Sequence, residues 1–92
     1  MDLKQCSDEE LIVRYRDGDT DAMDFIFERY KHLVRKKAKA MFLAGGDNDD
    51  LIQEGMIGLY KAIRDYNTDR EASFATFASM CINRQMITAV AA

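Results

Sequence analysis

The 92-residue sequence contains no proline, no tryptophan and only five glycines. Many-stranded sheets need frequent turns built on glycine and proline, so the scarcity of both argues against an all-β fold. Residues that favour helices, such as alanine, leucine, methionine, lysine and glutamate, are abundant. We therefore expect an all-α fold, a compact bundle of about four helices, in a single domain that spans residues 1–92.

Side chains suited to metal binding or catalysis are also few. Cys6 and Cys81 lie far apart in the sequence, and His32 is the only histidine, so no residues have the spacing of a metal site. The sequence has no glycine-rich phosphate loop and none of the common nucleophile or zinc motifs. We expect no catalytic residue, no metal and no cofactor. The lack of a signal peptide and of a disulfide framework favours a reducing, cytoplasmic setting.

Long apolar runs and a uniform charge are missing too. Residues 72–92 carry one charge, at Arg84, but polar side chains interrupt this stretch, so we expect no membrane span. The net charge of −3 hides an uneven distribution, because residues 31–41 hold five bases and no acid. Such a basic segment either follows a phosphate backbone or is simply a solvated helix face, and both interpretations stay open.

Capping residues and apolar spacing predict four helices. The first begins with the capping box Ser7-Asp8-Glu9-Glu10 and ends at about Asp17, before Gly18. The other predicted boundaries are a cap at Asp19 or Thr20 with a stop at Gly45-Gly46, a cap at Asp47, Asn48 or Asp49 with an end near Asn67, and a cap at Ser73 with a helix from Phe74 to about Ala91.

Two glycines, Gly55 and Gly58, lie inside the predicted third helix. Each costs about 1 kcal/mol relative to alanine in a helix interior. Their presence indicates that something approaches the helix backbone closely. That neighbour is either another helix of the same domain or an outside partner.

The predicted fourth helix has no acidic residue and combines Phe74 and Phe77 with small polar side chains. This composition suits single-stranded nucleic acid, because aromatic rings stack on bases, small polar groups contact base edges, and missing carboxylates avoid repelling phosphates. Taken alone, the same phenylalanines more often belong to a core.

Three segments together resemble region 2 of the bacterial sigma-70 family of transcription initiation factors. They are residues 50–63 (DLIQEGMIGLYKAI), 74–78 (FATFA) and 84–88 (RQMIT). Within the family the resemblance is to the sigma-H kind, the alternative factors of stationary phase and sporulation. The chain stops at Ala92, before any helix-turn-helix, so we expect an N-terminal fragment of a longer factor.

The resemblance implies two binding surfaces. The third helix would dock on a coiled coil of the beta-prime subunit of the RNA polymerase core, and Gly55 would lack a side chain to admit this partner. The fourth helix would recognise and melt the minus-ten promoter element by binding its non-template strand. An anti-sigma factor is a further partner that the resemblance allows. The polymerase contacts carried over by position are Asp50, Gln53, Glu54, Gly55, Met56 and Tyr60. The DNA contacts are Phe74, Thr76, Phe77, Met80, Cys81, Arg84, Gln85 and Thr88.

Two departures from the family pattern affect the fourth helix. Met80 and Cys81 stand where housekeeping sigma factors have adjacent tryptophans, so we expect weak base stacking and weak melting. One extra residue separates Ile82 from Arg84 and turns the following side chains by about 100°. The alternative function is a helical protein-interaction module that binds polymerase or a regulator without contacting DNA. This alternative predicts a fully buried Phe77 with no accessible basic or polar groove beside it.

Overall fold

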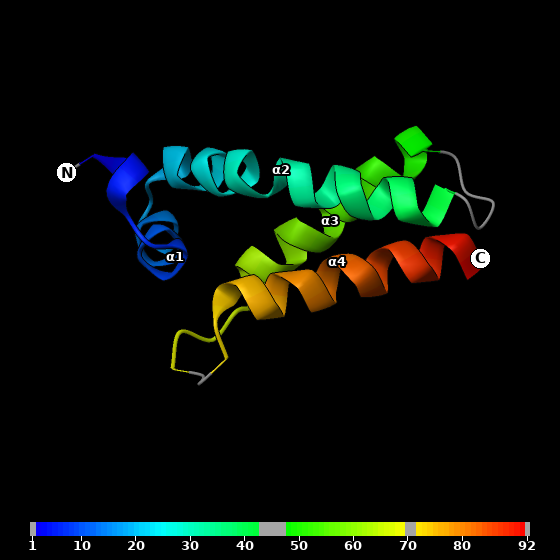
Figure 1. Cartoon of the computed structure of the whole chain (residues 1–92). Helices are drawn as coiled ribbons and strands as arrows, with labels where there is room; N and C mark the ends of the chain where they lie inside the picture. Colours follow the sequence, from blue (N-terminus) through cyan, green and yellow to red (C-terminus); the bar gives the residue numbers. More distant parts are fainter. Residues whose placement is uncertain (1, 43–47, 70–71, 92) are drawn as a thin grey trace.

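The structure is a computed structural model that describes residues 2–42, 48–69 and 72–91. No strand occurs in these residues, which form a 3-10 helix, η1 (Leu3–Gln5), and four α-helices, α1 (Asp8–Arg16), α2 (Thr20–Phe42), α3 (Asn48–Asp65) and α4 (Phe74–Ala91). α2, α3 and α4 run along the length of the molecule, and η1 and α1 lie at one end, beside the start of α2 (Figure 1). The prediction of an all-α fold is confirmed.

The predicted capping box forms at the start of α1. The Ser7 hydroxyl accepts a hydrogen bond from the Glu10 amide at 3.1 Å, and the Glu10 carboxylate accepts one from the Ser7 amide at 3.0 Å. This second hydrogen bond holds the pKa of Glu10 below its usual value. α1 ends at Arg16, and Gly18 follows with a φ of 106°, a conformation that favours glycine.

Two further predicted caps are present. The Asp19 carboxylate, just before α2, accepts a hydrogen bond from the Asp21 amide at 3.2 Å. The Ser73 hydroxyl, just before α4, accepts one from the Thr76 amide at 3.2 Å. Both caps satisfy first-turn amides that have no partner within the helix. Of the alternatives at the start of α2, Asp19 is therefore the cap.

Some helix boundaries differ from the expected ones, and other expected boundaries lie outside the described residues. α3 ends at Asp65, slightly before the expected end near Asn67, and the amide of the buried Tyr66 still donates to the Ala62 carbonyl oxygen at 2.9 Å. The short helix η1 was not predicted, although the Asp2 carboxylate caps it. The predicted stop at Gly45-Gly46 and the cap at Asp47 lie outside the described residues.

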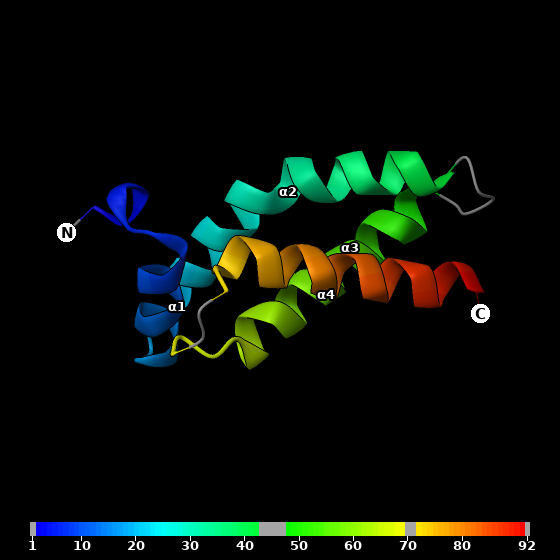
Figure 2. The same ribbon diagram turned by 60° about the horizontal axis from the view of Figure 1, so that its bottom comes forward.

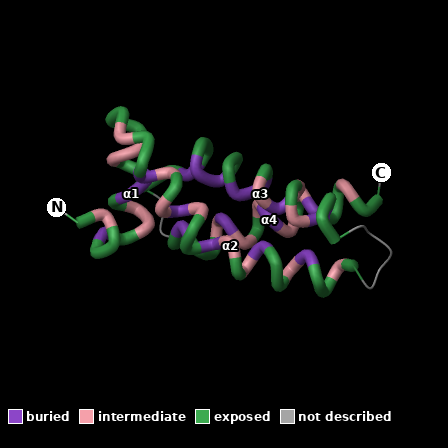
Figure 3. Tube along the Cα trace, turned by 90° about the horizontal axis from the view of Figure 1, so that it is seen from above, coloured by how far each residue is buried: buried purple, intermediate pink, exposed green. Residues whose placement is uncertain are grey.

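The inward sides of the four α-helices share one hydrophobic core (Figure 3). α4 packs most extensively on α3, while α2 runs alongside (Figure 2). No helix in the described residues is both long and apolar enough to cross a membrane. The largest fully buried side chains are Phe74, Leu11, Ile12, Ile26, Leu59, Ile63, Ile82, Met86 and Val34.

Side chains of the short helix α1 bind the end of α3 and the start of α4. The Glu9 carboxylate accepts a hydrogen bond from the Phe74 amide at 2.8 Å and thereby caps α4. The Arg16 guanidinium donates to main-chain carbonyl oxygens at the end of α3, those of Ile63, Arg64 and Tyr66. Because an acid at a helix start and a base at a helix end both oppose the helix dipole, α1 stabilises the α3–α4 pair electrostatically.

Candidate binding surfaces

α3 and α4 approach closely because Gly58 has no side chain. A Cβ atom at Gly58 would lie 2.8 Å from the carbonyl oxygen of Cys81 and 2.9 Å from the Cα of Ile82. Both atoms belong to the α4 backbone, which cannot move without shifting the whole helix. Gly58 therefore sets the distance between the two helices.

Gly55 is buried between α2 and α4. A Cβ atom there would overlap the terminal methyl of Met86 and lie 2.7 Å from a methyl of Val34. The absent side chain therefore makes room for two helices of the same domain. The expectation that Gly55 lacks a side chain to admit an outside partner is wrong, because its Cα faces the interior.

Four exposed residues at intervals of three or four form the outer face of α3: Asp50, Gln53, Ile57 and Tyr60. Ile57 and Tyr60 are both 43% exposed. Asp50, Gln53 and Tyr60 were predicted as binding residues, whereas Ile57 was not. Its signal in the sequence is that an isoleucine falls outside the core-facing spacing of the helix.

The other two predicted polymerase contacts, Glu54 and Met56, flank this outer face and are half-buried. Met56 packs against the core. The Glu54 carboxylate accepts a hydrogen bond from Nε2 of Gln85 at 2.7 Å, and Oε1 of Gln85 accepts one from Lys61 at 2.8 Å. The amide of Gln85, a predicted DNA contact, is thus bound to α3.

The orientation of Gln85 follows from the regularity of α4, which is α-helical from Phe74 to Ala91. The extra residue before Arg84 is therefore not absorbed by a bulge, and it rotates the following side chains about the helix axis. Arg84 is exposed, while Gln85 faces α3.

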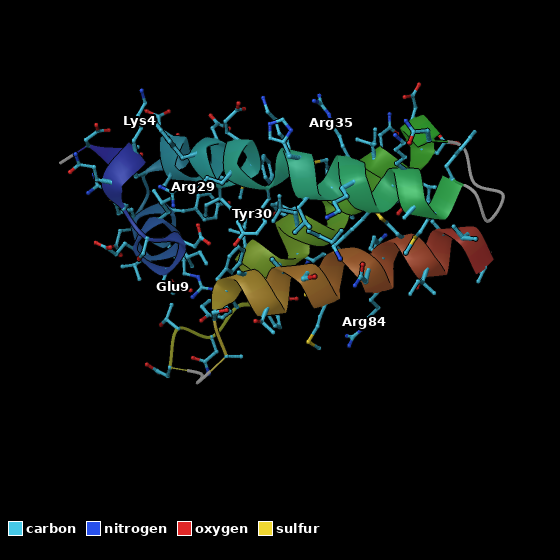
Figure 4. The ribbon with its side chains drawn as sticks, viewed as in Figure 1. Lys4, Glu9, Arg29, Tyr30, Arg35 and Arg84 are labelled. Carbon is cyan, nitrogen blue, oxygen red and sulfur yellow. The ribbon has the colours of Figure 1, made fainter. Side chains whose placement is uncertain are left out.

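Phe74, a predicted DNA contact, is fully buried. The rings of Tyr30 and Tyr66 meet it edge-on, with centroids 5.6 Å and 5.3 Å away. Figure 4 shows Tyr30 directed from α2 towards the start of α4. The expectation that Phe74 stacks on DNA bases is wrong, because its ring is enclosed by aromatic neighbours and anchors α4 in the core.

Phe77 and Cys81, both predicted DNA contacts, are half-buried. The Phe77 ring lies 5.6 Å from that of Tyr66 at an interplanar angle of 49°. Burial raises the pKa of the Cys81 thiol, which therefore stays protonated at neutral pH. Both side chains present one edge to the surface and pack the other against the core.

The remaining predicted DNA contacts are exposed and form the outer face of α4 together with an isoleucine: Thr76, Met80, Arg84, Ile87 and Thr88. Met80 is 52% exposed and Ile87 is 57% exposed. The Thr88 hydroxyl donates to the Arg84 carbonyl oxygen at 2.8 Å. Arg84 points away from α2 (Figure 4) and carries the only charge in residues 72–91. Ile87 was missed, because its spacing also fits a core position.

The basic residues of α2 do not form one surface. Lys31 pairs with Glu28 at 2.5 Å, which lowers the pKa of Glu28. Arg35 projects from the edge of the molecule opposite α4 (Figure 4). Lys37 instead reaches α4, where its Nζ donates to Oδ1 of Asn83 at 2.9 Å. A shallow hollow between α2 and α3 is lined by Arg35, Lys39, Phe42, Asn48 and Ile52.

Potential metal ligands are scattered in the structure. Within the described ranges, no three His, Cys, Asp or Glu side chains gather in a way that could hold a metal ion. His32 is exposed on α2, and Cys6 is buried. The candidate binding surfaces are therefore the exposed outer faces of α3 and α4.

Comparison with known sequences shows which protein family the chain matches. The family model described as "Sigma-70 region 2" matches residues 26–92. The RNA polymerase sigma-H factors of Bacillus subtilis and Bacillus licheniformis are each 50% identical over 86 residues, which is 94% of this chain and 39% of each relative. The sigma-K factor of B. subtilis is 34% identical over 70 residues, covering 76% of this chain and 24% of the relative. The chain thus spans about two fifths of the length of its sigma-H relatives.

Proposed function

The chain belongs to the sigma-70 family through its region 2, and from this premise we propose that it acts in transcription initiation. In this proposal it docks on the RNA polymerase core and recognises and melts the minus-ten promoter element. The outer face of α3 contacts the beta-prime coiled coil, and the outer face of α4 contacts the non-template strand. The domain acts by binding energy and catalyses no reaction.

One observation carries the proposal: two closely packed helices expose faces of different chemistry. On α3, the apolar groups of Ile57 and Tyr60 are exposed next to the polar side chains of Asp50 and Gln53, which precede them on the same face. Apolar and aromatic anchors with a polar rim are typical of protein interfaces. This pattern supports a protein partner on α3.

The outer face of α4 has the chemistry of a nucleic-acid surface. Its only charge is positive, at Arg84, and no carboxylate in residues 72–91 would repel phosphates. Met80 and Ile87 supply exposed apolar surface for contact with bases. Since Phe74 is enclosed in the core, Phe77 is the only aromatic residue of α4 that is partly accessible, which supports weak melting.

The alternative, a protein-interaction module without a DNA site, requires a fully buried Phe77. Phe77 is half-buried, and the exposed residues Thr76, Met80 and Arg84 surround its side of α4. This exposure supports the DNA-binding interpretation over the alternative.

The docking half of the proposal is tested with Ile57→Ser. We expect loss of binding to RNA polymerase core in a pull-down or titration, because truncating a central apolar anchor typically removes 2 kcal/mol or more, roughly 30-fold in affinity. Val13→Ser is the matched control, since Val13 is a 46% exposed apolar residue that belongs to α1 and not to the outer face of α3. Equal binding by both variants would place the docking surface elsewhere.

The DNA half is tested with Arg84→Ala. Promoter DNA is first selected from a random pool by the chain bound to polymerase core, and affinity is then measured with the minus-ten segment single-stranded. Arg84→Ala should weaken binding, whereas Arg35→Ala, which removes an exposed arginine from the opposite edge, should not. If the pool yields no preferred sequence, the domain reads no promoter element and the proposal fails.

A further inference from the structure

The seam between α2 and α4 contains a polar contact that no part of the function above explains. Nζ of Lys37 on α2 donates to Oδ1 of Asn83 on α4 at 2.9 Å, and both side chains are half-buried. None of the salt bridges among the described residues involves Lys37. The half-buried lysine therefore has a neutral amide, and no carboxylate, as its hydrogen-bond partner in this seam.

The donors and acceptors of this pair are unbalanced. A lysine ammonium has three N–H donors and no acceptor, and one of the three is used on Asn83. The Asn83 amide oxygen accepts this bond, so its NH₂ group carries two further donors, and no hydrogen bond from them is found within the described residues. The pair therefore offers several donors at one point. Phosphate oxygens, which are only acceptors, complement such a site.

The position of the pair connects it with the outer face of α4. Asn83 directly precedes Arg84, and Met80 and Ile87 lie one turn away on either side. Residues 72–91 and 29–42 contain no acid, so no carboxylate lies in either helix segment that borders the seam. A strand lying on α4 would have this seam at its edge, where its phosphates can reach Lys37.

We propose that Lys37 and Asn83 together bind a phosphate of the DNA strand that occupies the outer face of α4. The DNA-binding surface then extends from α4 onto α2. Four other α2 bases stay outside it: Arg35 and Lys39 lie towards α3, Lys31 pairs with Glu28 and Arg29 pairs with Asp8. This inference rests on the proposed function, because the strand on α4 supplies the phosphate.

The first test compares Lys37→Ala with the matched control Lys39→Ala. Both remove one lysine from α2, but Lys39 lines the hollow towards α3. Affinity for the selected DNA, with polymerase core present, is measured between about 50 and 200 mM salt. The slope of log affinity against log salt should fall by about 0.7 to 0.9 for Lys37→Ala, the loss of one phosphate contact, and should not change for Lys39→Ala.

The second test, Asn83→Asp, separates phosphate binding from a purely structural role. The new carboxylate has almost the same shape and gives Lys37 an ionic partner, so the fold should be at least as stable in a thermal melt. A bound phosphate would be repelled, so DNA affinity should fall for every sequence tested.

The outcomes distinguish this inference from the proposed function. If the wild-type chain binds selected DNA but Lys37→Ala keeps the full salt slope, or Asn83→Asp keeps full affinity, the pair only joins two helices and the inference is overturned. If the wild-type chain selects no DNA at all, both the inference and the proposed function are overturned.

Discussion

α3 and α4 are both 18 residues long and pack against each other, but the residues that they place in the contact differ in size. α3 presents small residues, Gly55 and Gly58, whereas α4 presents larger ones, Ile82 and Met86. α4 is also held from outside the pair, since Glu9 caps it and two tyrosines enclose its first residue. Because these contacts hold α4 in place, the residues of its outer face are not needed to stabilise the fold.

Among the variants that test this difference between the helices, Phe74→Ala is expected to have the largest effect on stability. Emptying a fully buried aromatic site should lower the free energy of unfolding by about 3 to 5 kcal/mol, which is much of the stability of a small domain. Phe77→Ala should cost clearly less, because that ring is half-exposed. Urea unfolding followed by circular dichroism measures both. Equal losses would mean that the two phenylalanines do not differ in role.

Gly58→Ala should have the next largest effect. The added methyl meets the α4 backbone, and such overpacking typically costs about 1 to 3 kcal/mol, against a gain of about 1 kcal/mol in helix propensity. Gly55→Ala should be milder, because the added methyl meets the ends of two side chains, Met86 and Val34, and no backbone atom. Urea midpoints of the two variants provide the comparison. A stabilised Gly58→Ala would show that the helices have room to spare.

A smaller effect separates the inner flank of α4 from its outer face. Gln85→Ala removes hydrogen bonds to Glu54 and Lys61 and should lower stability by about 1 kcal/mol. Arg84→Ala, one position away and exposed, should leave the melting temperature unchanged while weakening DNA binding. If Arg84→Ala destabilises the domain instead, its side chain belongs to the fold and the assigned faces are wrong.

The smallest effect concerns the tyrosine that holds the start of α4. The Tyr30 hydroxyl donates to Asp8 at 2.5 Å, and burial raises the pKa of Tyr30 above its usual value near 10. The unfolded chain therefore loses this proton at lower pH than the folded chain, so the contribution is complete below about pH 10 and declines as the pH rises further.

Tyr30→Phe should remove this part of the alkaline pH dependence. The difference between the two proteins is expected to stay below about 1 kcal/mol, because the hydroxyl bonds to Asp8, whose side chain is partly exposed so that solvent screens the interaction. Thermal melts of both proteins from neutral pH to above pH 10 measure it. Identical slopes would show that Tyr30 titrates normally and is not held by burial.

The features that could be predicted from the sequence are those made by residues close together in the chain. The capping box Ser7–Glu10 and the Ser73 cap of α4 each join residues three apart, so the local pattern is sufficient. Gly18 needed only its own backbone preference. The expectation that a glycine in the third helix marks a close approach was also correct, but the neighbour at Gly55 is α2 and α4, not an outside protein.

The errors arise where the answer depends on which flank of a helix is covered. Phe74 and Phe77 lie three residues apart on α4, and spacing alone cannot say which ring is enclosed by Tyr30 and Tyr66. The DNA contact of Gln85 stays a prediction, but its motif did not show that α3 lies on its side of the helix and binds its amide. Ile57 was overlooked although its place outside the core-facing spacing of α3 is a signal in the sequence, and its exposure of 43% confirms that it faces outward.

The sequence by itself determined the helices, their caps and the family, because helix periodicity and capping act over a few neighbouring residues. Only the tertiary structure decided which side of each helix faces outward, since burial depends on contacts between segments distant in the chain. The Lys37–Asn83 contact joins residues 46 positions apart. Lys37 and Lys39 are the same residue type, two positions apart on α2. Packing alone directs Lys37 to α4 and Lys39 towards α3.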